Sequence, residues 1–219
     1  RSLFPNVPDE KFSIIPNGMD FELFNQDIKK DPMLLVNTSS PDRSMDVLPK
    51  LFKEIKKRIP EARCKWAYGW EIYDNTFANN KERIAWRNKI NAEMEEAGIE
   101  NLGRLSQKEC AKLYLQGRIL AFPTEFAEID CITVKKAQAC GCTPVTTDFG
   151  ALNESVQYGV KIHSNKHKDN WSVPYQISFG LESIKAQEEW VDAVVKILES
   201  PVKEEKEMKE WSKKFDWNL

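Results

Sequence analysis

The sequence lacks any long apolar run: across its 219 residues, no stretch approaches the roughly 18 consecutive apolar residues of a membrane-spanning helix. It also lacks an excess of one charge, because 32 Lys and Arg stand against 34 Asp and Glu, a formal net charge of -2. Without a basic field, general electrostatic attraction to nucleic acid or to an anionic membrane is excluded. We expect no nucleic-acid partner, and any anionic ligand must be held by local geometry.

Side chains that bind metals are sparse and scattered. The two histidines, His163 and His167, lie far along the chain from the closest cysteine pair, Cys140 and Cys142. An odd number of cysteines, five, at irregular spacing is typical of reduced thiols and indicates a cytoplasmic setting. We expect small buried thiols packed beside Gly141 and no metal site.

Apolar strand-like runs alternate with segments of helical periodicity along the chain. Strands are expected at 33–38, 64–68, 99–102, 119–122, 143–146 and 159–163, and helices at 45–59, 80–97, 106–115, 131–140 and 182–199. Ser106 and Glu109 form the pattern of a capping box. The stretch 163–178 has the composition of a surface excursion, and a charged amphipathic tail carries Trp211 and Trp217.

Strands that are apolar nearly throughout, alternating with such helices, predict an α/β fold with a mostly parallel sheet covered by helices on both faces. Right-handed crossovers make this a doubly wound, Rossmann-like sheet, whose ligands bind at the carboxyl ends of its strands. No G-x-G-x-x-G follows the first strand, which disfavours an epimerase or dehydrogenase that uses a dinucleotide.

The loop after the first expected strand, 38–44, suits an anion. It opens with three hydroxyl side chains at 38–40, Ser39 among them, and places Arg43 at an expected helix N-terminus, where free N–H groups and the helix dipole favour negative charge. The alternative is that Ser40 or Asp42 merely caps the helix and Arg43 is solvated.

The second and third loops are less specific. Gly69 permits close backbone approach, and the aromatic residues after it have the faces to stack on a base or sugar, or else cover the sheet edge as a turn. Arg104 and Leu105 precede the helix capped by Ser106, where backbone groups can meet a nucleobase edge.

The fourth loop, 122–131, carries three carboxylates within six residues: Glu125, Glu128 and Asp130. They would repel one another in a shared buried pocket. Either they face water, or the hydroxyls and cations of a ligand separate them.

Three segments, read in order, resemble the retaining GT-B glycosyltransferases of family four. Residues 14–20, Ile-Ile-Pro-Asn-Gly-Met-Asp, are similar to the family's I-P-N-G-V-D interdomain hinge. Residues 102–106, Leu-Gly-Arg-Leu-Ser, are similar to its G-x-hydrophobic-S helix entry. Residues 122–128 followed by 136–145 resemble its P-S-x-x-E and E-A-x-A-C-G-x-P-V signature. The resemblance covers roughly residues 14–160 and three motifs in the correct order.

The resemblance implies a donor domain for a nucleotide sugar, with no cofactor and no bound metal. Glu128 matches the glutamate near the transferred sugar, and is the catalytic candidate. Arg43 matches the lysine that binds the diphosphate. The remaining donor-binding candidates are Ser39, Gly69, Arg104, Leu105, Asp130, Cys131, Ile132, Thr133 and Lys136, and those from Asp130 to Thr133 act through backbone amides.

Two positions depart from the family pattern. The second signature glutamate, eight residues after Glu128, is Lys136 here, and an ammonium donates hydrogen bonds where a carboxylate accepts them. Lys136 has three possible roles: to donate to a ribose oxygen, to contact phosphate, or, with Lys135, to pair with Asp130. The arginine expected five residues before Arg43 is Thr38, so one of two phosphate-binding cations is missing unless Lys136 supplies its charge.

The resemblance therefore predicts an enzyme, a glycosyltransferase that transfers a sugar with retention to a sugar, lipid or protein acceptor. The alternative is a degenerate, non-catalytic module that binds a nucleotide or sugar. Residues 1–30 are expected to end an N-terminal domain and form the hinge, 31–200 to bind the donor, and 201–219 to form a helix that crosses back. The chain opens without an initiator Met, so we expect the acceptor domain to be missing and this chain to be inactive alone. Peripheral membrane association of the full-length enzyme is compatible with the resemblance.

Overall fold

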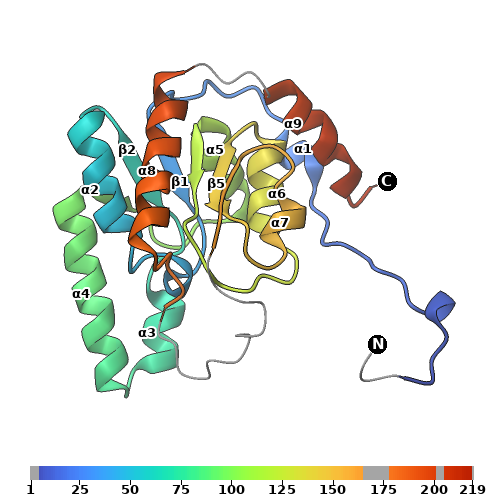
Figure 1. Ribbon diagram of the computed structural model, residues 1–219, viewed down its shortest axis with the longest axis horizontal. Coiled ribbons are helices and arrows are strands. Elements are labelled where there is room, and N and C mark those ends of the chain that lie inside the picture. The colour runs from blue at the N-terminus through green and yellow to red at the C-terminus, as the bar shows by residue number, and fades with distance from the viewer. Residues whose placement is uncertain (1–4, 165–177, 201–204, 219) are drawn as a thin grey trace.

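The computed structural model describes residues 5–164, 178–200 and 205–218, and within them the chain forms one six-stranded sheet (Figure 1). All its strand pairs are parallel, and the order is β3-β2-β1-β4-β5-β6. The strands are β1 (Leu34–Asn37), β2 (Arg63–Trp66), β3 (Ile99–Asn101), β4 (Ile119–Ala121), β5 (Thr143–Thr147) and β6 (Val160–Ile162). Strand order reverses between β1 and β4, the position at which doubly wound sheets bind ligands.

The helices fill the connections between the strands. They are α1 (Phe21–Phe24), α2 (Leu48–Arg58), α3 (Glu71–Phe77), α4 (Lys81–Ala97), α5 (Gln107–Gln116), α6 (Ile132–Ala139), α7 (Leu152–Ser155), α8 (Ile184–Glu199) and α9 (Glu205–Ser212). Three short 3₁₀ helices are η1 (Asp9–Lys11), η2 (Pro41–Arg43) and η3 (Lys213–Phe215). The predicted doubly wound α/β fold is confirmed, with each predicted strand and long helix in place.

Two hydrophobic cores lie on the two faces of the sheet. In β1, Leu35 points into the core beneath α2, α4 and α8, while Leu34 and Val36 point into the core beneath α1, α5 and α6. Successive strand side chains alternate between faces, so a strand covered on both sides must be apolar throughout. This explains why β1 reads as a continuous apolar run.

Local signals set the ends of the principal helices. The predicted capping box at α5 is confirmed, because Ser106 accepts from the Glu109 backbone N–H and Glu109 accepts from that of Ser106. At α4, Asn80 accepts from the Arg83 N–H, and Gly98 ends the helix with a left-handed φ of 74°.

Helix α3 was not predicted, because the segment after Gly69 was interpreted as a loop or turn. Trp70, Tyr73 and Phe77 recur at spacings of three and four, and Trp70 and Tyr73 are buried. The Trp70 ring stacks edge-on against Tyr73, with centroids 5.5 Å apart. Trp70 and Tyr73, which were candidates for stacking on a ligand, are therefore buried where α3 packs on α4.

The segment at Met19 lies beside the C-terminal end of the described chain. Met19 donates its N–H to Phe215 O at 2.8 Å and accepts from Trp217 N at 3.0 Å, and α9 packs along α6. Before this point the N-terminal segment extends away from the body (Figure 1). Trp217 remains 71% exposed and Ile14 98% exposed. The proposed domain boundaries stay predictions.

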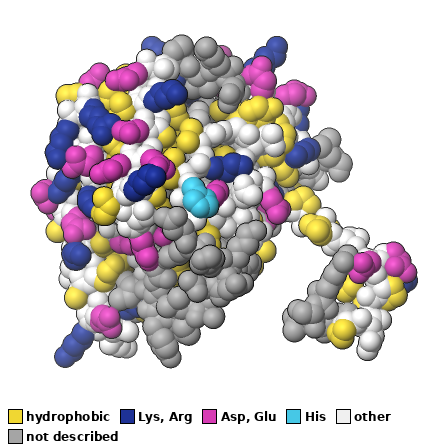
Figure 2. All heavy atoms as spheres, in the orientation of Figure 1, with side chains coloured by type: hydrophobic (Ala, Val, Ile, Leu, Met, Phe, Trp, Pro, Cys, Tyr) yellow, Lys and Arg dark blue, Asp and Glu magenta, His cyan; other side chains and the backbone are white. Residues whose placement is uncertain are grey.

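The surface carries both signs of charge, interspersed over α2 and α8 on the face shown in Figure 2. None of the helices in the described ranges combines the length and apolar character that a membrane crossing requires. The expected surface excursion at 163–178 lies almost entirely outside the described residues.

Candidate functional site

The loop between β4 and α6 carries the candidate site and is held to the sheet by backbone contacts. Ala151 N donates to Glu128 O at 2.9 Å. Gly150 has a φ of 58°, and a Cβ there would lie 3.1 Å from the Glu128 backbone nitrogen. Only glycine suits that position, so the turn after β5 fixes the backbone that carries Glu128.

Arg43 and Glu128 face each other across the switch point of the sheet. Arg43 Nε lies 3.4 Å from Glu128 Oε1, and Arg43 Nη1 lies 2.6 Å from Asp42 Oδ2. The Arg43 guanidinium stacks on Phe126, 3.3 Å from the ring centroid. The Arg43 and Glu128 side chains keep 22% and 19% exposure, so both remain open to a ligand.

Burial raises the pKa of Glu128 above its ordinary range, and the neighbouring Arg43 charge opposes that shift. A carboxyl pushed toward its neutral form beside a cation is the kind of group that functional sites tune.

The three carboxylates of the loop do not share a pocket. Glu125 is buried and accepts from Ser164 Oγ at 2.7 Å, whereas Glu128 pairs with Arg43. Asp130 pairs with Lys135 and accepts from Asn17 N at 2.6 Å. Each carboxylate has its own partner within the protein, which keeps the three charges apart.

The Asp130 pair ties the site to both chain ends. Lys135 is almost fully buried, with 4% side-chain exposure, and its ammonium also lies 4.3 Å from the centre of the Phe215 ring. Asn17 Nδ2 donates to Asp130 O at 3.2 Å. Of the alternatives for the two lysines, Lys135 therefore pairs with Asp130 and Lys136 does not.

The start of α6 offers backbone donors. Cys131 is the N-cap residue and makes no side-chain capping bond to the first turn, where Ile132 and Thr133 stand. The first N–H groups of a helix and its dipole together favour an anion at such an end, although here the N–H groups of Thr133 and Val134 also face the Cys131 sulfur. Burial raises the pKa of Cys131 to about 12, so its thiol stays neutral.

The prediction for the first loop needs a correction. Arg43 was expected at the N-terminus of the helix after β1, but residues 41–43 form η2 and α2 begins only at Leu48. Ser40 and Asp42 cap nothing in α2, because its N-cap is Val47, with no side-chain capping bond. Arg43 is therefore not at the N-terminus of α2 and acts without the dipole of that helix. The helix that begins closest in sequence to its partner Glu128 is α6.

Two residues of this loop are engaged internally. Ser39 is buried, its N–H donates to Asn37 Oδ1 at 3.0 Å, and its carbonyl accepts from Trp66 Nε1 at 2.9 Å. Thr38 shares a hydrogen bond with the buried Tyr114 hydroxyl. Ser39 thus acts first as a structural residue of the loop.

The second and third loops meet through their glycines. A Cβ on Gly69 would lie 2.9 Å from Gly103 Cα, and both residues have positive φ, 71° and 67°. Arg104 lies over the Tyr68 ring at 5.6 Å, and Leu105 packs on the second core. The candidates in these loops are adjacent, at the carboxyl ends of β2 and β3.

Lys136 points toward the third loop. Its ammonium donates to Gln107 Oε1 at 2.8 Å and lies 5.4 Å from the centre of the Phe24 ring. Burial lowers the pKa of Lys136. It therefore lies beside the N-terminus of α5, on the side of α6 that faces α5.

Asn17 and Phe126 are functional candidates that the sequence did not single out. Phe126 orients Arg43, and Asn17 anchors Asp130. Both lie within motifs that were recognised, but only the folded chain shows what they contact. In the described part of the chain no cluster of three or more His, Cys, Asp and Glu side chains could hold a metal. The expected thiols beside Gly141 are confirmed as buried, since Cys140 and Cys142 have no exposure.

No family model and no curated protein matches the sequence. Solved structures do match. The pneumococcal O-GlcNAc transferase GtfA, in complex with UDP and GlcNAc, superposes with a TM-score of 0.60 at 15% identity, over 92% of this chain and 35% of GtfA. Sucrose-phosphate synthase from Thermosynechococcus elongatus gives 0.64 at 15% identity, over 93% of this chain and 48% of that one.

A third structure, Anabaena HepE in complex with UDP-glucose, gives a TM-score of 0.55 at 13% identity, over 98% of this chain and 59% of HepE. The chain therefore shares its fold with a domain of each of these three proteins. The chain spans between about a third and three fifths of the length of these three structures. The expected Rossmann-like half of a GT-B fold is thereby confirmed.

Proposed function

We propose that the chain is the donor domain of a retaining glycosyltransferase and binds a nucleotide diphosphate sugar. The observation that carries the proposal is the pairing of Arg43 with Glu128 at the switch point of the sheet, in the loop that leads directly into α6. Two structures of the same fold hold such ligands: GtfA is in complex with UDP and GlcNAc, and HepE with UDP-glucose.

Each group has a role in this proposal. Arg43 and the amides of residues 130–133 receive the diphosphate, and they stabilise the negative charge that grows on it as the bond to the sugar breaks. Glu128 faces the transferred sugar, where a carboxyl can accept from a hydroxyl or, when neutral, donate to one. The loops at Gly69, Arg104 and Leu105 lie where a nucleoside can reach them. The group of the acceptor that is glycosylated, on a sugar, lipid or protein, is proposed to be held mainly by a domain beyond this chain.

Lys136 is proposed to supply the second positive charge that Thr38 does not. A modest shift away from Gln107 would let its ammonium donate to a ribose oxygen or a phosphate. Replacing it with the glutamate of the family pattern, K136E, should weaken binding of the nucleotide sugar. Unchanged or tighter binding would refute this role.

A second candidate function is a non-catalytic binding module. The hydrogen bond between Thr38 and Tyr114 favours it, because the position of one expected phosphate-binding cation is occupied by a neutral, internally bonded side chain.

Calorimetry with UDP, GDP, ADP and NAD tests the proposal. Binding of one nucleoside diphosphate, tightened by its sugar conjugate, supports a donor domain. Equal binding with and without the sugar favours the module. Selective binding of NAD, or no binding of any nucleotide, would refute the proposal.

A further inference from the structure

A cavity of about 330 Å³ lies outside the proposed donor site, between the loop after β1 and helix α3. Its walls include Asp42, Tyr68, Tyr73, Phe77 and Arg83. None of these residues belongs to the set that the resemblance assigns to the donor. Its size is at the lower end of the range of about 300–1,000 Å³ typical of small-molecule pockets, which suits one ring.

Aromatic rings form much of the cavity wall. Tyr73 and Phe77 lie one turn apart on α3 with ring centroids 4.7 Å apart, and Tyr68 approaches from the end of β2. Ile72, beside them, is 42% exposed. Flat aromatic faces of this kind pack against the C–H face of a sugar ring and leave its hydroxyls free for polar groups.

Arg83 gives the cavity its charge. The guanidinium lies 5.0 Å from the centre of the Phe77 ring, which orients it, and within the described ranges it forms no ion pair. Asp42, the other charged residue of the wall, is already paired with Arg43 at 2.6 Å. Arg83 is therefore the charged side chain of the wall that has no ion-pair partner within the described residues.

We propose that this cavity binds an acidic sugar unit. Arg83 takes the carboxylate or phosphate in a two-pronged contact, and the aromatic wall takes the ring. Asp42 remains available to accept from a ring hydroxyl while it is paired with Arg43.

The cavity adjoins the proposed donor site through one side chain. Arg43 contacts Asp42 of the cavity wall and Glu128 of the donor loop. An acidic sugar in the cavity would thus lie next to the transferred sugar, as part of an acceptor chain. That last step rests on the proposed function, whereas binding of the acidic sugar itself does not.

The test is an NMR titration of the ¹⁵N-labelled chain with glucuronic acid, glucose 6-phosphate and glucose. We expect both acidic sugars to shift the amides of α3 and the first turn of α4, and to bind more tightly than glucose. R83Q should weaken binding of both acids about three- to tenfold and leave glucose unchanged. Shifts by only one acid would identify the source of the charge as carboxylate or phosphate, and would still support the site.

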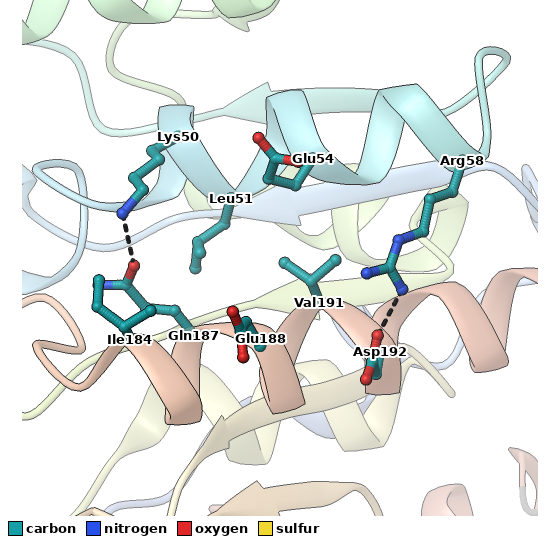
Figure 3. Close-up of a pocket in the computed structure, with 9 residues that line it drawn as sticks. All are labelled: Lys50, Leu51, Glu54, Arg58, Ile184, Gln187, Glu188, Val191 and Asp192. Atoms are coloured by element: carbon teal, nitrogen blue, oxygen red, sulfur yellow. Dashed lines mark hydrogen bonds and ion pairs between the residues drawn. The ribbon is translucent and has the colours of Figure 1, made fainter.

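The matched control is R58Q. Arg58 lies in a groove of about 400 Å³ between α2 and α8, which Lys50–Gln187 and Arg58–Asp192 contacts bridge (Figure 3). R58Q should leave the binding of all three sugars unchanged. F77L, which keeps Arg83 but removes the ring, should weaken glucose and the acids alike.

Three outcomes would overturn the proposal: no shifts at α3 and α4, shifts only around Arg43 and α6, or equal effects of R83Q and R58Q. A parallel UDP titration separates the two proposals. Binding of acidic sugars without any nucleotide binding refutes the donor domain alone, and the reverse refutes the acidic-sugar site alone.

Discussion

Arg43 bridges two carboxylates, with Nη1 2.6 Å from Asp42 and Nε 3.4 Å from Glu128. A diphosphate would add a third negative partner to this one guanidinium. Because burial already raises the pKa of Glu128, protonation of Glu128 is the direct way to free Arg43 for a ligand. Ligand binding and the charge of Glu128 are therefore coupled.

The first prediction follows from that coupling. The affinity of wild type for a nucleoside diphosphate should fall, relative to E128Q, as the pH rises through the pKa of Glu128. E128Q should bind at least as tightly as wild type at neutral pH. Calorimetry from about pH 5 to pH 8 gives the affinity of both proteins. Because the nucleotide itself titrates in this range, E128Q serves as the control for that effect. Parallel pH profiles would contradict the coupling.

The second prediction concerns stability after loss of Arg43. R43M leaves Glu128 charged and half-buried without its cation, so we expect the free energy of unfolding to fall by about 1–2 kcal/mol at pH 7. This is less than the cost of breaking a fully buried ion pair, because both side chains are partly exposed. A raised carboxyl pKa means that the folded protein binds the Glu128 proton more tightly than the unfolded chain does. The deficit should therefore shrink as the pH falls and Glu128 takes a proton. Urea unfolding at several pH values checks this, and a deficit that grows in acid would contradict it.

The third prediction uses the paired glycines. G69A introduces a Cβ 2.9 Å from Gly103 Cα at a φ of 71°, whereas G103A introduces one with nothing within 4 Å at a φ of 67°. G103A should cost about 1 kcal/mol from backbone strain alone, and G69A about 1–3 kcal/mol more from the contact. Thermal or urea unfolding measures the difference. Equal costs would mean that the two loops separate easily.

The fourth prediction compares neighbouring lysines. K135M removes an almost fully buried cation from its pair with the 22% exposed Asp130 and should destabilise the fold by about 2–3 kcal/mol. K136M removes a half-buried side chain bonded to Gln107, and should cost under about 1 kcal/mol. The same unfolding assay compares them, and a larger cost for K136M would reverse the structural assignment.

Much of the fold could be predicted because its signals are local. The apolar run at Leu34–Asn37 and the capping pair at Ser106 and Glu109 depend on neighbouring residues alone. Helix α3 carried a signal of the same kind, in the spacing of Trp70, Tyr73 and Phe77, but a preceding glycine and a short length made a loop equally plausible.

The site was less predictable, because its contacts join distant segments. That Glu128 belongs with Arg43 and that Asp130 belongs with Lys135 and Asn17 depends on tertiary packing. The position of Arg43 was misjudged because η2 and the turn after it delay α2 to Leu48. The cavity at Arg83 is formed in part by α3. Because α3 was not predicted, the cavity could not be predicted from the sequence either.

The most direct test of the donor-domain account is the affinity of R43M for the nucleoside diphosphate that wild type binds best, measured by calorimetry beside R58M. The account predicts binding by wild type, a loss of about 10- to 100-fold in R43M, and no change in R58M. Binding by R43M that equals wild type would contradict the account, as would the absence of diphosphate binding by wild type.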